Sequence, residues 1–128
     1  MSFKALLKVN GKEYNVLNCS YKLRQETDET GRPSSVTRGG KVHLIVESTA
    51  DTDLSDWMFN NFERKDCSIV FLKRDDNATL KELKVTEAYM VEYHEGFDST
   101  GDNPMTEDFV ISAKTIEMGN GSFTNEWV

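Results

Sequence analysis

Alternating apolar and polar residues that lead into an Asn-Gly pair constrain the fold of this chain more than any other feature. Residues 3 to 9 carry an apolar side chain at every second position: Phe3, Ala5, Leu7 and Val9. Successive side chains of a strand point to opposite sides, so this spacing is typical of a β-strand with one buried face. Asn10-Gly11 follows directly, and both residues tolerate the positive φ angles of a two-residue turn. The sequence therefore predicts a β-hairpin at its start.

Further runs have the same strand-like pattern. They cover residues 12 to 24, 41 to 49, 67 to 74, 83 to 94 and 107 to 118. In the first of them the apolar phase changes near Val16 and Leu17, which indicates a β-bulge or a sharp bend. Gly39-Gly40 stands just before the second run and predicts a bulge or the close approach of another backbone.

The later part of the chain gives two more expectations. In residues 83 to 94 the spacing predicts one shared face for four side chains: Val85, Tyr89, Val91 and Tyr93. The tail from Gly119 onward is rich in small polar residues, so we expect it to be loosely held.

One segment has the period of an α-helix. Its expected core face repeats at i, i+3, i+4 and i+8 and consists of Leu54, Trp57, Met58 and Phe62. Asp51, Thr52 and Asp53 offer capping oxygens at its start, and Arg64 and Lys65 suit the negative end of the helix dipole. The sequence predicts a helix over residues 53 to 64.

These elements together predict a mainly β fold. One helix among several antiparallel strands favours a β-barrel of about six to eight strands with the helix packed on its side. The length suits a single domain over residues 1–128. Because residues 41 to 49 and 107 to 118 have apolar groups on both faces, we expect the helix or another subunit to cover the second face.

Charge and hydropathy exclude two classes of partner. The chain has 15 Lys and Arg against 22 Asp and Glu, a net charge of −7, which argues against binding to nucleic acid. No apolar run approaches the ~20 residues of a membrane span, so we expect no membrane insertion. The start, MSFKALLKVNGKEY, turns polar too early for a signal peptide, so we expect synthesis and folding in the cytoplasm.

Few residues suggest a catalytic, metal-binding or cofactor-binding site. His43 and His94 lack a neighbouring ligand at metal-binding spacing, and Cys19 and Cys67 each lie in a strand-like run, as buried free thiols do. We therefore expect no metal, no cofactor and no catalytic residue. Two alternatives stay open: an enzyme that pairs Cys19 or Cys67 with a histidine, and a monomeric ligand-binding β-barrel with an apolar pocket.

The longest predicted loop is an unusual feature. Residues 25–38 are too many and too polar for a hairpin turn, and loops longer than about 12 to 15 residues are uncommon in compact domains unless they are functional or disordered. The loop combines both signs of charge with a stiffening proline: Glu26, Asp28, Glu29, Arg32, Pro33 and Arg38. This composition favours an arm that docks on another protein.

Three long segments carry a family resemblance: NGKEYNVLNCSYKLRQETDETGRPSSVTRGGKVHL, WMFNNFERKDCSIVFLKRDDNATLKELKVTEAYMVEY and TEDFVISAKTIEMGNG. They resemble the tube protein of the type VI secretion system, the Hcp or TssD family, in the form found in Bacteroidota. The resemblance covers nearly the whole chain and includes no catalytic motif.

The resemblance implies a structural tube subunit. Such a protein forms a homohexameric ring, and stacked rings make the inner tube that a contractile sheath propels, with effectors in the lumen. It also implies a spike protein (VgrG), sheath and baseplate proteins as partners, and secretion by the system itself without a signal peptide. By position, residues 25–38 match the extended loop that reaches an adjacent ring. A phage-derived tail tube or baseplate component is the alternative with the same architecture.

Overall fold

The computed structural model describes residues 3–73, 78–97, 99–100 and 105–125. Within them the chain forms β1 (Phe3–Val9), β2 (Lys12–Tyr21), β3 (Lys41–Glu47), α1 (Asp53–Phe59), β4 (Arg64–Lys73), β5 (Thr79–Phe97), β6 (Met105–Met118) and β7 (Gly121–Thr124). At seven residues, α1 falls well short of a membrane span, and no other helix occurs in the described part of the chain.

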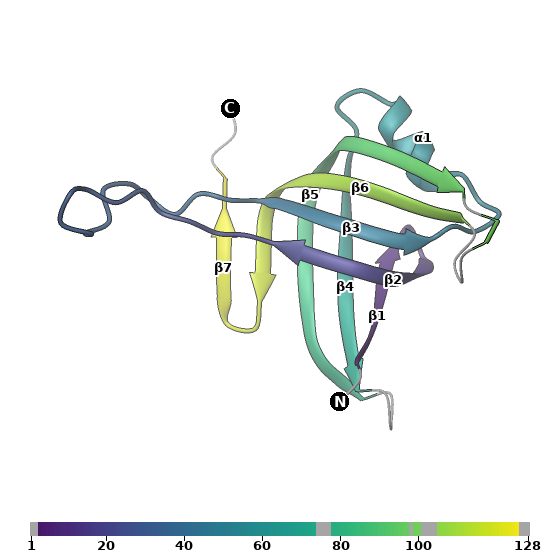
Figure 1. Cartoon of the computed structure of the whole chain (residues 1–128), viewed down its shortest axis with the longest axis horizontal. Helices are drawn as coiled ribbons and strands as arrows, with labels where there is room; N and C mark the ends of the chain where they lie inside the picture. Colours follow the sequence, from purple (N-terminus) through teal and green to yellow (C-terminus); the bar gives the residue numbers. More distant parts are fainter. Residues whose placement is uncertain (1–2, 74–77, 98, 101–104, 126–128) are drawn as a thin grey trace.

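The strands form one antiparallel sheet that closes on itself. Neighbours follow the order β3-β2-β1-β4-β5-β6-β7, and β3 also pairs with β6, so β1 to β6 make a closed barrel while β7 extends it from β6 (Figure 1). Closure leaves the barrel strands without free edges. The predicted mainly β, antiparallel barrel with one helix at its side is confirmed.

The turn of the first hairpin and the bulge in its second strand form as the sequence predicts. Asn10 and Gly11 have φ angles of 55° and 73°, which a turn between two strands of this twist requires. The register between β2 and β3 shifts between Val16 and Asn18, so the predicted bulge is confirmed.

The barrel interior is filled by side chains. Its largest fully buried members come from the six barrel strands and the helix: Trp57, Tyr14, Phe109, Leu7, Leu44, Leu54, Ile69, Leu83, Ile111, Val42, Val46 and Val85. The described interior therefore holds a packed core, which speaks against the predicted alternative of a barrel built around an apolar ligand pocket.

The predicted helix over residues 53–64 is wrong at its C-terminal end. α1 stops at Phe59, and Arg64 and Lys65 already belong to β4. The Trp57 indole donates a hydrogen bond to the Glu63 carbonyl oxygen at 3.0 Å, which holds the chain in a turn. Phe62 lies in that turn with φ of 64° and is 87% exposed, so its predicted place on the core face is also wrong.

The cap of α1 differs in detail from the expectation. Thr52 occupies the N-cap position without a side-chain capping bond. Asp51 partly caps the start of the helix, because its carboxylate accepts a hydrogen bond from the backbone N–H of Asp53 at 3.2 Å.

The predicted shared face in β5 is wrong. Leu83 and Val85 are buried, but the buried positions then move to Ala88 and Met90. The cause is a bulge at Glu87, whose φ is 50° and whose N–H donates to the Asp66 carboxylate at 2.8 Å. One extra residue turns every following side chain to the opposite face.

A second irregularity lies further along β5. The register with β6 shifts between Met90 and Glu92, which leaves Val91 exposed and returns Tyr93 to the half-buried face. The predicted loose tail is wrong for residues 121–124, which pair with β6 as β7, whereas its last part, 126–128, lies outside the described residues.

Candidate functional site

The arm, which we define as residues 22–40 between β2 and β3, projects far from the barrel as a narrow ribbon (Figure 1). Its two limbs are joined by backbone hydrogen bonds at two levels. Arg24 and Arg38 exchange bonds of 2.9 and 2.6 Å, and the Ser34 N–H donates to the Glu26 oxygen at 2.7 Å. The predicted loop 25–38 is therefore an ordered β-ribbon.

A turn around Asp28 closes the tip of the arm. One carboxylate oxygen of Asp28 accepts the Thr30 N–H at 2.8 Å, the Thr30 hydroxyl at 2.7 Å and the Arg32 N–H at 3.1 Å. These bonds, led by that of the hydroxyl, lower the pKa of Asp28 below its ordinary value. Gly31 has φ of 86°, which glycine adopts without strain.

The acidic and basic side chains of the arm differ in their partners. Glu26 forms an ion pair with Arg38 at 3.8 Å, and Asp28 is engaged in the turn. The guanidinium groups of Arg24 and Arg32 have no ion-pair partner among the described residues. The carboxylates of Glu26 and Asp28 are thus bound within the arm, whereas the guanidinium groups of Arg24 and Arg32 remain available to a partner.

The predicted loop residues contribute unequally to this ribbon. Pro33 lies in the bridge with Thr27, where its fixed φ suits an extended limb. Glu29 is exposed in the turn at the tip. Val36, which the sequence did not single out, is 77% exposed on the returning limb.

The base of the arm is held by Asn125, just after β7. Its amide donates to the Gly39 oxygen at 3.2 Å and to the Ala113 oxygen at 3.0 Å, and the Ala113 N–H donates to the Gly40 oxygen at 2.7 Å. Gly40 has φ of 103°, and a Cβ there would lie 2.3 Å from the Asn125 amide nitrogen. The close approach predicted at Gly39-Gly40 is confirmed.

The helix side of the molecule combines buried and exposed aromatic residues. Leu54 and Trp57 are 1% and 2% exposed, and Met58 packs partly buried against the same core. Phe59, the last residue of α1, is instead 78% exposed, and Phe62 in the turn that follows is 87% exposed.

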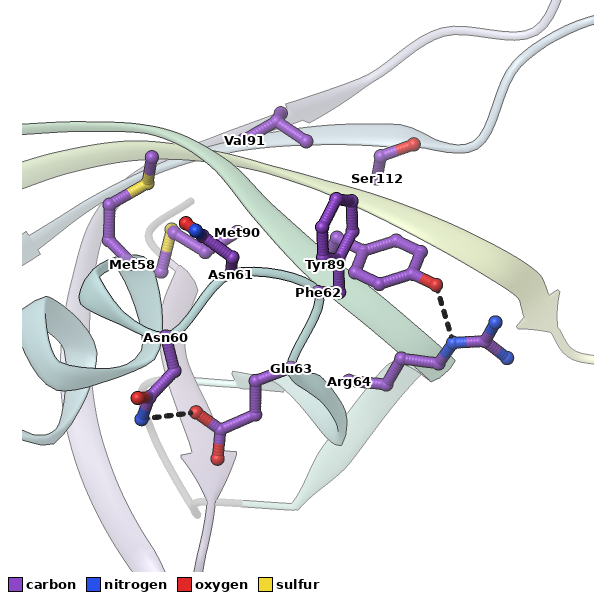
Figure 2. A pocket seen from close by; sticks show the side chains of 10 residues that line it. All are labelled: Met58, Asn60, Asn61, Phe62, Glu63, Arg64, Tyr89, Met90, Val91 and Ser112. Carbon is purple, nitrogen blue, oxygen red and sulfur yellow. Dashed lines mark hydrogen bonds between the residues drawn. The ribbon is translucent and has the colours of Figure 1, made fainter.

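A surface hollow of about 670 Å³ lies between the turn after α1 and the β5–β6 surface, and Phe62 is among the residues that line it (Figure 2). On its wall the Arg64 guanidinium donates to the Tyr89 hydroxyl at 2.7 Å and lies 3.5 Å from the Glu87 carboxylate. Lys114 approaches the same carboxylate at 3.6 Å. The polar wall is thus satisfied within the chain.

Two partly buried hydroxyl–carboxylate pairs include the buried Tyr14 and Glu107. Tyr93 donates to Glu107 at 2.7 Å, and Tyr14 donates to Asp51 at 2.7 Å. Burial raises the pKa of Glu107, the nearby carboxylates of Glu95 and Asp51 raise it further, and the bond from Tyr93 opposes the shift. Burial is also the main cause that raises the pKa of Tyr14.

The thiols and imidazoles do not form a catalytic pair. Burial raises the pKa of Cys19 to about 11 and of Cys67 to about 12, so both remain protonated thiols at neutral pH. Cys19 pairs with Leu44, whose side chain faces the core, whereas His43 lies on the other face and bonds to Asp108. Within the described residues no group of His, Cys, Asp or Glu has the arrangement of a metal site.

The sequence missed the residue that holds the arm in place and the exposed aromatic residue at the end of α1. Asn125 belongs to no motif, and only Gly39-Gly40 signalled that something lies against that backbone. Phe59 falls outside the apolar helical spacing and gave no signal of its own.

Comparisons with known proteins give a consistent result. The family model of hemolysin coregulated protein Hcp (TssD) matches residues 1–128. Hcp1 from Flavobacterium johnsoniae is 62% identical, with 95% of this chain and 99% of that chain covered and a TM-score of 0.92. No curated protein matches the sequence.

More distant structures share the fold. Hcp1 from Salmonella typhimurium is 15% identical, covering 97% of this chain and 93% of that chain with a TM-score of 0.75. A chain of the sheath-tube complex of PVC, an extracellular contractile injection system, is 19% identical, with coverage of 90% and 87% and a TM-score of 0.55.

The barrel, the helix at its side, the family match over the full length and the identity to a solved Hcp1 agree, and the chain is a member of the Hcp (TssD) family, the ring-forming tube subunits of the type VI secretion system.

Proposed function

We propose that this tube subunit closes into homohexameric rings and that the arm joins each ring to the next. The arm leaves the barrel from one end only, so a contact made by it is head to tail, and such contacts propagate into filaments. Stacked rings then form the inner tube that the contractile sheath drives outward, with effectors in its lumen.

The observation that carries this proposal is the order of the arm. A ribbon closed by backbone bonds at Arg24 and Glu26 and fixed at its base by Asn125 is pre-organised, so docking costs less conformational entropy than ordering a free loop. Arg24 and Arg32 supply charge-assisted hydrogen bonds to carboxylates of the next ring. The arm from Lys22 to Arg38 has four basic and three acidic residues, whereas the whole chain carries −7.

The further partners follow from the same role. The end of such a tube meets a spike protein (VgrG), its wall meets sheath proteins and its base meets baseplate proteins. The subunit is assembled in the cytoplasm and leaves the cell through the system itself. Its role is structural, since the thiols are protonated and the described polar clusters have partners within the chain.

Deletion of Thr27 to Ser34 tests the role of the arm. The bonds between Arg24 and Arg38 remain in this variant, so the barrel is expected to fold and to form rings of normal mass in native mass spectrometry. Electron microscopy in negative stain should show single rings in place of stacks. Loss of the rings themselves would show that the arm closes the ring, and unchanged stacks would exclude it from the axial contact.

Salt provides a second test of the same contact. Exposed ion pairs are screened within about 8 Å at physiological ionic strength, whereas apolar contacts are not weakened by salt. We expect stacks to shorten as sodium chloride increases while ring mass stays constant. An equal response of rings and stacks contradicts an ionic axial contact.

A further inference from the structure

The end of the barrel that lies away from the arm carries exposed apolar side chains. Phe97 at the end of β5 is 72% exposed, and Met105, its register partner at the start of β6, is 42% exposed. Glu47 pairs with Thr106, so both side chains lie at the opposite end of β3 from the arm. Figure 1 shows the arm on the left, whereas β3 ends and β6 begins on the right. Neither side chain belongs to the packed core.

Two carboxylates lie beside this apolar pair. The Ser48 N–H donates to the Met105 carbonyl oxygen at 3.1 Å, and the Ser48 hydroxyl donates to the Glu95 carboxylate at 3.1 Å. Glu47 directly precedes Ser48. Neither Glu47 nor Glu95 forms an ion pair within the described part of the chain. We call Glu47, Glu95, Phe97 and Met105 the far-end surface.

Further negative charge lies behind the far-end surface. Glu107, the register partner of Glu95, is 3% exposed. Burial is the main cause that raises its pKa, and the carboxylates of Glu95 and Asp51 raise it further. Lys12 is electrostatically coupled to Asp51 but is already bound to Asp53 at 2.9 Å. Carboxylates are therefore held close together here, and a cation supplied by another chain relieves their repulsion.

The arm has the opposite charge and an exposed apolar residue of its own. The guanidinium groups of Arg24 and Arg32 form no ion pair among the described residues. Val36 is 77% exposed and lies on the returning limb between the two bridges that join the limbs. Arg24 belongs to one bridge, and Arg32 directly precedes Pro33 of the other. The arm thus places an apolar side chain between two cations.

The spacing of the two surfaces agrees. Neighbouring strands lie about 4.8 Å apart, so Glu47 on β3 and Glu95 on β5 are separated by about 10 Å across β6, whose first residue belongs to the apolar pair. On the arm, the two bridges that flank Val36 begin at Arg24 and Thr27, and this length of extended chain also spans about 10 Å. Each surface therefore holds its charges on both sides of an apolar centre.

We propose that the arm of one copy docks on the far-end surface of a copy in the next ring. Val36 meets the apolar pair, and the guanidinium groups of Arg24 and Arg32 bind the two carboxylates. The arm points away from the far-end surface of its own chain, so the contact is heterologous and repeats along a filament. The inference rests on the proposed stacking of rings and names the surface that receives the arm.

The first experiment reverses the charges on each side of the contact. Arg24→Glu with Arg32→Glu gives rings with acidic arms, and Glu47→Lys with Glu95→Lys gives rings with a basic far-end surface. Native mass spectrometry should show rings of normal mass for both variants, because all four side chains lie outside the core. Electron microscopy in negative stain should show single rings for each variant alone. Stacks in either variant would overturn the proposal.

Mixing the two kinds of ring tests the pairing directly. The acidic arm of one kind then faces a basic surface, and the unmodified arm of the other kind faces an acidic surface, so both contacts are restored. The mixture should form stacks in which the two kinds alternate, and energy transfer between fluorescent labels on the two kinds detects this order. A mixture that stays as single rings would overturn the pairing of the arm with the far-end surface.

Glu82→Lys with Glu117→Lys is the matched control for the far-end variant. It changes the net charge by the same amount, at the opposite ends of β5 and β6 from the far-end surface. This control should stack as the unmodified protein does. Loss of its stacks would show that total charge, and not the far-end surface, governs stacking.

Serine variants test the apolar centre of the contact. Phe97→Ser should shorten the stacks while ring mass is unchanged, and Val36→Ser should have the same effect. Phe59→Ser is the matched control, since that phenylalanine is 78% exposed at the end of α1. Stacks of normal length in Phe97→Ser, or equal shortening in the control, would exclude the apolar part of the contact.

The outcomes separate this inference from the proposed function. If deletion of Thr27 to Ser34 leaves stacks unchanged, the proposed role of the arm fails. If that deletion abolishes stacks but rings with the reversed far-end surface still stack, only the assignment of the receiving surface fails.

Discussion

The arm and the barrel are both built from antiparallel β-structure, but different interactions hold them. The barrel buries large apolar side chains such as Trp57 and Leu44 at or below 2% exposure. The arm buries almost nothing and relies on backbone bonds, the Asp28 turn and one amide at its base. A segment that projects from the barrel has no apolar interior of its own, so its shape has to come from local hydrogen bonds and not from a core.

The largest expected effect lies in the barrel. Trp57→Ala removes a buried indole and its bond to Glu63, and we expect it to lower the free energy of unfolding by about 3–5 kcal/mol. Chemical denaturation followed by fluorescence or circular dichroism measures this loss. Phe59→Ala is the matched control, and we expect a change within about 0.5 kcal/mol because that ring is exposed. Similar losses in both variants would contradict the division between core and surface.

An intermediate effect is expected where the two regions meet. Asn125→Ala deletes hydrogen bonds to Gly39 and Ala113, which should cost about 1–2 kcal/mol in unfolding free energy. It should also widen the distribution of distances between spin labels on the arm tip and the barrel. Asn120→Ala, an exposed asparagine in the turn before β7, should change neither quantity. A narrow, unchanged distribution in Asn125→Ala would show that the arm is fixed by other contacts.

A smaller effect concerns pH and Glu107. Because its pKa is raised in the folded protein, the native state holds that proton more tightly than the unfolded chain does. This contribution is complete below the unfolded pKa of about 4.3 and is lost as the pH rises through the raised value. Glu107→Gln keeps an acceptor for the Tyr93 hydroxyl without the charge, so we expect a higher melting temperature at pH 7 and a weaker decline between pH 4 and 7.

Glu117→Gln is a suitable comparison for the Glu107 measurement, since Glu117 is exposed on the same strand and is not among the groups that shift the pKa of Glu107. A melting temperature of Glu107→Gln below that of the unmodified protein at pH 7 would contradict the expectation.

The smallest global effect is expected in the arm. Asp28→Ala removes three bonds that close the tip, yet the barrel does not depend on them. We expect the melting temperature to change by less than the error of the measurement while proteolysis near Gly31 becomes faster. Asp28→Asn preserves an oxygen acceptor and should protect the tip more than Asp28→Ala does. A clear loss of barrel stability in Asp28→Ala would show that the arm and the barrel unfold together.

Sequence reasoning succeeded where neighbouring residues decide the structure. Asn10-Gly11 determines the first turn through its own φ angles, and the change of apolar phase at Val16 appears as a bulge because one extra residue moves side chains across the sheet. The length and polarity of residues 25–38 likewise identified a projecting arm before its shape was known.

Prediction from the sequence failed where a contact beyond the local spacing pattern determines the structure. Phe62 keeps helical spacing from Leu54, but the Trp57 bond to Glu63 ends the helix first. The faces of β5 depend on a contact from Glu87 to Asp66 on the neighbouring strand. Spacing within one strand contains no information about such a contact, so the side chains after the bulge were assigned to the wrong face.

The position of Asn125 in the chain has a consequence for biosynthesis. The ribosome adds 86 further residues after Gly39 before the amide that fixes the arm emerges. The strands β3 to β7 are therefore all synthesised before the amide that fixes the base of the arm is added. The structural support of the arm is among the last described residues to join the chain.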